Sequence, residues 1–132
     1  MIATHKAQCY NYFMNFCLKH YAHIGDAVWE LFIREDVIYH TSNQRQMHNL
    51  TTKFVNAEFQ SEILDKMSDF FTDEENELIR RGRNLPLTVA KRNNPQTHRN
   101  ATSLEVITGY FYLNDKKRLE EFFKNIKKNL KI

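Results

Sequence analysis

The apolar residues of this chain recur with the spacing of an α-helix along almost its whole length. They follow the i, i+3, i+4 pattern between residues 10 and 39, through one or two helices, and again from residue 47 to about 70, through one long helix. A further helical stretch runs from about 97 to 113, and another from 116 to 130. No stretch alternates for long enough to be a strand. The pattern therefore predicts an all-α fold, a helical bundle with short connections.

A short helix is predicted between the longer ones. Thr72 and Glu75 have the spacing of a capping box that opens a helix through Ile79, and Gly82 has the position of its C′ glycine. Residues 84–94 follow no period and form an expected loop of about a dozen residues. Loops of this length in compact domains are more often functional or mobile than merely connecting.

The composition bounds the class of protein. The 132 residues suffice for one domain, 1–132, with its own core, and 42% hydrophobic residues argue against disorder. No run approaches the roughly 18 apolar residues of a membrane span, and the N-terminus lacks a signal-peptide pattern. Cys9 and Cys17 lie about 12 Å apart on one expected helix, too far for a disulfide. We therefore expect an intracellular, cytoplasmic protein that does not contact membranes.

Charge is segregated along the chain although the formal net charge is only +3. Residues 65–77 carry six acids and one lysine, whereas residues 80–104 carry six basic residues and no acid. The predicted last helix is also rich in lysine. Such segregation is typical of proteins that bind polyanions, although a basic helix face is often only a solvated surface.

Two of the three glycines fall inside predicted helices, each beside an acid. Asp26 follows Gly25, and Gly109 lies one turn after Glu105, on the same face of its helix. Glycine costs about 1 kcal/mol relative to alanine in a helix interior, so both positions call for an explanation. If the two helices cross at their glycines, Asp26 and Glu105 converge.

Converging carboxylates predict a metal site. Like charges at short range suppress ionisation unless a cation lies between them. A hard oxygen site with open positions favours Mg²⁺, which can activate water for attack on a phosphodiester. The alternative is that Asp26 and Glu105 are half-exposed acids paired with Arg34 or Arg99.

Three stretches together resemble one enzyme family, the Mini-III branch of the ribonuclease III family, which lacks the double-stranded-RNA-binding domain. They are Ile24-Gly-Asp-Ala-Val28 with Glu30; Arg80-Arg-Gly-Arg-Asn84; and Gln96-Thr-His-Arg99 leading into Leu104-Glu105 and Gly109-Tyr110. The resemblance covers roughly residues 21–130. The combination in this order is specific, whereas Gly-Asp-Ala alone is a weak signal.

The resemblance implies an all-α, homodimeric endonuclease domain. It implies Mg²⁺-dependent cleavage of double-stranded RNA, with Mn²⁺ able to substitute, and products with 5′-phosphate and 3′-hydroxyl ends. The expected substrate is a precursor of large-subunit ribosomal RNA, with a ribosomal protein as a candidate assistant. Asp26 and Glu105 match the catalytic, metal-binding acids of the family.

Two positions depart from the full-length members of that family. Ala22 stands where they have a glutamate, and Thr102 where they have an aspartate. Both departures resemble the Mini-III branch and leave two protein carboxylates per subunit. His23 stands where a tyrosine is expected.

The basic residues from 80 to 99 are the candidates for contact with the RNA backbone, and contacts of this kind set affinity and its salt dependence. The candidates are Arg81, Arg83, Lys91, Arg92 and Arg99. Glu30 is either an additional acid beside the site or a structural partner of a nearby basic residue. Trp29 is expected in the core or a dimer interface, and His98 is expected to be structural.

Two other functions fit parts of the pattern. A non-catalytic RNA-binding or ribosome-associated module would explain the missing acids at positions 22 and 102, but not the presence of Asp26 and Glu105. A helical interaction domain would explain the apolar periodicity, but neither the charge segregation nor the glycines.

Overall fold

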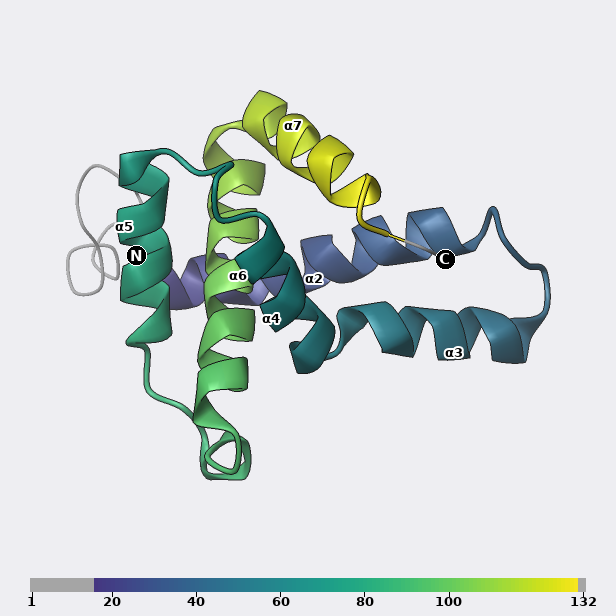
Figure 1. The fold of residues 1–132 in the computed structure, drawn as a ribbon, viewed down its shortest axis with the longest axis horizontal. Helices are drawn as coiled ribbons and strands as arrows, with labels where there is room; N and C mark the ends of the chain where they lie inside the picture. The colour runs from purple at the N-terminus through teal and green to yellow at the C-terminus, as the bar shows by residue number, and fades with distance from the viewer. Residues whose placement is uncertain (1–15, 131–132) are drawn as a thin grey trace, which may run out of the picture.

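The computed structural model describes residues 16–130, and every regular element in that range is helical. The elements are α2 (Leu18–Val37), α3 (Gln44–Val55), α4 (Ala57–Lys66), α5 (Asp73–Arg83), the short 3₁₀ helix η1 (Val89–Lys91), α6 (Pro95–Asn114) and α7 (Lys116–Lys127). The predicted all-α fold is confirmed (Figure 1). The expected helical pattern before residue 16, with Cys9, lies outside the described residues.

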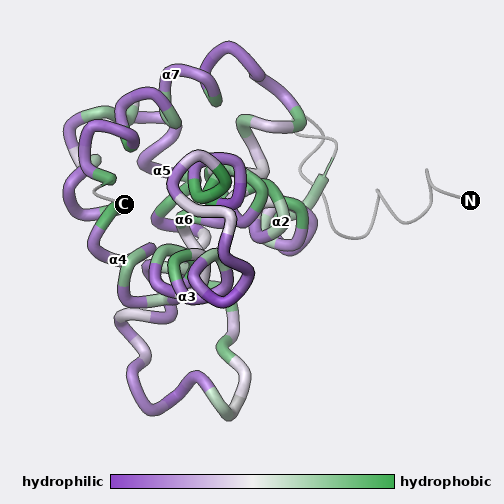
Figure 2. The backbone as a smooth tube through the Cα atoms, turned by 90° about the vertical axis from the view of Figure 1, so that its right-hand side faces the viewer, coloured by the Kyte–Doolittle hydropathy of each residue, from purple (hydrophilic) through white to green (hydrophobic). Residues whose placement is uncertain are grey.

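Helix α6 is the centre of the fold. It contacts α2, α4, α5 and α7, and α2 lies across it (Figure 1). Leu104, Ile107 and Phe111 are fully buried on this helix. Figure 2 shows hydrophobic stretches concentrated on α2 and α6, with hydrophilic stretches towards the outside. Because neighbours cover α6 on several sides, its sequence lacks a wide polar face.

The crossing of α2 and α6 is built on the two glycines, as predicted. A Cβ at Gly25 would collide with the carbonyl oxygen of Glu105 and lie 2.9 Å from the backbone nitrogen of Gly109. A Cβ at Gly109 would collide with the carbonyl oxygen of Tyr21. The absence of both side chains lets the two backbones touch. This contact compensates for the helix propensity that the glycines lose.

The prediction of a single helix from about 47 to 70 is wrong, because the helix is interrupted at Asn56. Asn56 has extended backbone angles (φ −76°, ψ 164°), and its side chain accepts a hydrogen bond from the Phe59 amide at 2.8 Å. It therefore ends α3 and caps α4. Asparagine is among the preferred N-cap residues, so Asn56 favours the start of a new helix. The apolar spacing continues through this position and therefore does not mark the break.

The predicted start of α5 is confirmed, and its predicted end is wrong. The Glu75 amide donates to Thr72 Oγ1 at 3.2 Å, and the Thr72 amide donates to Glu75 Oε1 at 3.0 Å, which completes the capping box. Helix α5 continues to Arg83, so Gly82 lies inside it. A Cβ at Gly82 would lie 3.2 Å from Ser103 Cα, so this glycine serves close packing against α6.

The connection from α5 to α6 contains fewer irregular residues than the sequence predicts. The 3₁₀ helix η1 occupies part of it, and α6 begins at Pro95, two residues before the expected start near Thr97. Proline is favoured at the first helical position because its fixed φ suits the helix and it needs no amide partner there.

Candidate active site

The carboxyl groups of Asp26 and Glu105 meet beside the crossing of α2 and α6. Asp26 is exposed and Glu105 is partly buried, and their side chains are hydrogen-bonded to each other. Burial, this hydrogen bond and the charge of Asp26 raise the pKa of Glu105 from its ordinary value of 4.5 to about 8, while Lys91 opposes the rise. One proton is thus held between two acids at neutral pH.

This donor set fits a divalent cation. Both groups are hard oxygen ligands, and a cation would replace the shared proton and remove the repulsion between the carboxylates. Among residues 16–130, no group of three or more histidine, cysteine, aspartate or glutamate side chains could hold a metal. The protein's contribution to such a site is therefore the Asp26–Glu105 pair, and water and phosphate oxygens would complete the coordination of the ion.

The structure speaks against the alternative in which arginines neutralise these acids. Arg34 instead pairs with Glu30 at 2.9 Å, one turn along α2. No ion pair between described residues involves Asp26, Glu105 or Arg99. The interpretation of Glu30 as a structural partner of a basic residue is thus confirmed.

The predicted RNA-binding residues fall into two groups. Lys91, Arg92 and Arg99 are exposed around the connection between α5 and α6, and Lys91 is close enough to influence the charge of Glu105. Arg81 and Arg83 lie on α5 and are half-buried. None of the five forms an ion pair with another described residue.

Arg83 already has a structural partner that the sequence pattern did not indicate. Its Nε donates to Asn100 Oδ1 at 3.0 Å, and Asn100 Nδ2 donates to Ser61 Oγ at 3.0 Å. Asn100 is 6% exposed and links α4, α5 and α6. The sequence pattern singled out residues 96–99 for their charge. The buried amide of Asn100, the next residue, instead connects the three helices.

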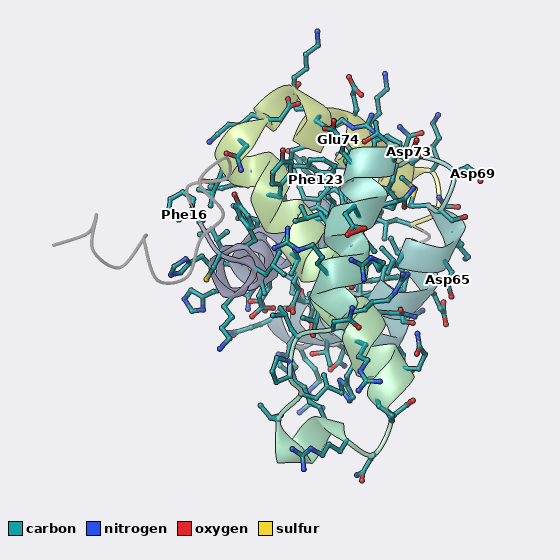
Figure 3. The ribbon with its side chains drawn as sticks, turned by 90° about the vertical axis from the view of Figure 1, so that its left-hand side faces the viewer. Phe16, Asp65, Asp69, Asp73, Glu74 and Phe123 are labelled. Atoms are coloured by element: carbon teal, nitrogen blue, oxygen red, sulfur yellow. The ribbon has the colours of Figure 1, made fainter. Side chains whose placement is uncertain are left out.

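Part of the charge segregation has a local cause in α5. Its first turn carries Asp73, Glu74 and Glu75, and its last turn carries three arginines. Acids at the N-terminus and bases at the C-terminus of a helix both complement its dipole. Figure 3 shows Asp65, Asp69, Asp73 and Glu74 along one edge, away from the connection between α5 and α6 at the bottom of the view. The acids therefore leave the active-site end basic.

Trp29 belongs to the core. It is 1% exposed, and its indole nitrogen donates to the Phe54 carbonyl at 3.0 Å, which ties α2 to α3. Of the two predicted locations, core or dimer interface, the core is confirmed.

A pocket of about 270 Å³ opens beside Glu105 and contains a residue that the sequence argument missed. Lys19 lines it together with Ala22, Lys91 and Thr102. The signal was present in the spacing, because Lys19, Ala22 and Asp26 follow i, i+3, i+7 along α2 and so lie near one face.

Similarity to known proteins defines the class of this protein. The family described as "Ribonuclease III domain" matches residues 19–116. A Mini-ribonuclease 3 from Synechocystis sp. is 38% identical over 100 residues, which are 76% of this chain and 70% of that protein. A Mini-ribonuclease 3 from Staphylococcus aureus is 33% identical over 110 residues, with coverage of 80% and 82%.

A solved structure agrees with these matches. The crystal structure of a protein from Fusobacterium nucleatum superposes with a TM-score of 0.70 at 26% identity, covering 83% of this chain and 89% of that one. The chain belongs to the ribonuclease III family. Within that family it groups with the Mini-ribonuclease 3 proteins, and it is an endoribonuclease.

None of the helices between residues 16 and 130 is long and apolar enough to cross a bilayer.

Proposed function

We propose that this endoribonuclease cleaves double-stranded RNA with a Mg²⁺ ion held by Asp26 and Glu105. The observation that carries the proposal is the contact of Gly25 with the backbone of Glu105, because it fixes the two acids side by side. A bound Mg²⁺ supplies Lewis-acid chemistry: it activates water for attack on phosphorus and stabilises the leaving oxygen. We expect products with 5′-phosphate and 3′-hydroxyl ends.

The chain's own residues bind the ion and position the substrate. Glu105 must lose its proton for the pair to act as ligands, and the neighbouring Lys91 favours that loss. Arg92 and Arg99 are exposed, and we expect them to contact phosphates of the RNA. Because A-form RNA hides its major-groove base edges, recognition would rest on backbone shape and 2′-hydroxyl contacts.

We further propose that two copies act together, one on each strand. Leu31 is 56% exposed, and Ala27, one turn earlier on α2, is also exposed. This short apolar stripe runs beside Asp26, so a second copy covering it would bring two active sites together. A dimer would also present the basic surface twice, which would strengthen its attraction for RNA phosphates. Precursors of large-subunit ribosomal RNA are the proposed substrate.

A hairpin assay tests the function. Purified protein is incubated with a double-stranded RNA hairpin in Mg²⁺ or in EDTA, beside the Asp26→Asn variant. We expect cleavage only by the unsubstituted protein in Mg²⁺, and fragments that a 5′-phosphate-dependent exonuclease degrades. Binding without cleavage in Mg²⁺ would favour an RNA-binding module instead.

A further inference from the structure

We propose that the pocket beside Glu105 is a subsite for the RNA phosphate next to the one that is cleaved, with Lys19 as its positioning cation. The inference rests on the proposed function, since it concerns the same strand at the same site. Lys19 lies at the start of α2, Lys91 comes from η1, and Glu105 comes from α6. Three segments distant in sequence therefore form the walls of one cavity.

The chemistry of the walls suits an anion. Among the described residues that line the pocket, Glu105 is the single acid, whereas Lys19 and Lys91 are both basic. Both lysines are exposed, and neither forms an ion pair with any residue between 16 and 130. A phosphate would meet charge that is not already neutralised, so it would gain charge-assisted hydrogen bonds.

The small side chains of the pocket make room for the strand. Ala22 contributes only a methyl group, and the Thr102 hydroxyl donates to the His98 carbonyl, one turn earlier on α6, at 2.9 Å. Leu85, Pro86 and Leu87 add an apolar side that fits sugar carbons better than water.

The spacing along α2 assigns the pocket to a neighbouring phosphate. Lys19 precedes Asp26 by two helical turns, about 10 Å at 1.5 Å per residue. The phosphate that reacts must lie against Asp26 and Glu105. A cation two turns away therefore meets the strand one step further along, where it sets register rather than chemistry. Lys19 is a positioning residue, and it acts by holding the strand.

Binding measured without cleavage tests this assignment. In the Asp26→Asn background, Lys19→Gln should weaken binding of an RNA hairpin about tenfold at low salt and reduce the salt slope by about one. Lys19→Arg should restore both. Lys66→Gln, an exposed lysine at the end of α4, serves as the matched control and should change affinity less than twofold. Equal effects at positions 19 and 66 would overturn the proposal.

A phosphate scan identifies the contact. Hairpins carrying one uncharged methylphosphonate each, at successive positions around the cleaved bond, are bound by the Asp26→Asn protein with and without Lys19→Gln. We expect one flanking position to weaken binding only when Lys19 is present. If every position weakens both proteins equally, Lys19 has no phosphate partner and the assignment is wrong.

Steady-state cleavage separates this proposal from the proposed function. With Asp26 intact, Lys19→Gln should raise KM about tenfold and change kcat less than twofold, because the lysine holds the strand outside the reacting bond. A large loss of kcat at unchanged KM would contradict a positioning role. If the unsubstituted protein fails to cleave, the proposed function is wrong, and the binding experiments still decide the fate of the phosphate subsite.

Discussion

Among single residues, Glu105 has the most unusual carboxyl group of this site, because it keeps its proton beside Asp26 at neutral pH. Glu105 carries a carboxyl group whose pKa is raised to about 8 by burial and by Asp26, in the helix that contributes Leu104, Ile107 and Phe111 to the core. When this carboxyl group loses its proton, the buried charge destabilises the fold. The same ionised group can then bind a cation. The same residue therefore links stability, pH and metal binding.

Stability without metal should fall as the pH rises. The folded-state pKa of Glu105 lies above its unfolded value, so its contribution is complete below about pH 4.5 and is lost as pH rises through about 8. In EDTA, we expect Glu105→Gln to raise the melting temperature relative to the unsubstituted protein by about 4 °C or more at pH 8, and by much less at pH 5. Thermal unfolding at both pH values checks this. An equal difference at the two pH values would contradict the raised pKa.

A partly buried ion pair joins the start of α5 to α7. Arg118 binds both oxygens of Glu75 at 2.7 and 2.9 Å and donates to the Phe70 carbonyl at 2.8 Å. The Glu75 side chain is only 12% exposed.

Removing this arginine should be costly because it leaves the largely covered Glu75 carboxylate without its ion-pair partner. We expect Arg118→Ala to lower the free energy of unfolding by about 3 kcal/mol, measured by urea denaturation. Arg34→Ala breaks the exposed pair with Glu30 and should cost less than about 1 kcal/mol. If the two variants lose the same stability, Arg118 has no special role.

At the level of secondary-structure elements, the pairing of Asp26 with Glu105 depends on the crossing of α2 and α6. Propensity alone favours alanine over glycine at Gly25 by about 1 kcal/mol. The Glu105 carbonyl stands where the new methyl group would go, so the helices would have to separate. Helix propensity would stabilise the alanine variant and the clash would destabilise it. We expect the clash to be the larger effect.

Gly25→Ala should therefore destabilise the protein by about 2–3 kcal/mol, as overpacking does, and should reduce cleavage more than stability alone explains. Gly82→Ala is the matched control within α5. Its methyl group would lie 3.2 Å from Ser103 Cα and should cost less, without a specific loss of cleavage. A stabilised Gly25→Ala variant would show that the helices do not touch there.

These elements also show what sequence could and could not predict. The crossing followed from two glycines that helices disfavour, and the capping box at Thr72 from its spacing. The break at Asn56 was missed because the apolar period continues through it, so only the cap marks the end of α3. Gly82 was misassigned because a glycine near a helix end and one inside a close contact look the same in sequence. Lys19 was missed because its role depends on η1 and α6.

At the scale of the whole molecule, acids and bases are separated between one edge and the active-site end. The acidic edge around α4 and the start of α5 lies away from the connection that carries Lys91 and Arg92 (Figure 3). RNA would approach the basic end, and a dimer would present that surface twice.

The proposed dimer face can be tested with one substitution. Leu31→Glu places a charge on the exposed apolar stripe of α2 and should convert a dimer into a monomer, measured by light scattering after gel filtration. Leu113→Glu, at a 40% exposed position on α6, is the control and should leave the assembly unchanged. A strict monomer before any substitution would contradict the two-strand mechanism.

We expect Asp26 and Glu105 to act as one unit, and single-turnover cleavage of an RNA hairpin in Mg²⁺ measures whether they do. Residues that act as a unit show strongly non-additive losses. We predict that Asp26→Asn and Glu105→Gln each slow cleavage by at least about 100-fold and that the double variant is no slower than the worse single one. Glu30→Gln should retain the rate within a few fold. Wild-type cleavage by either single variant would contradict the account.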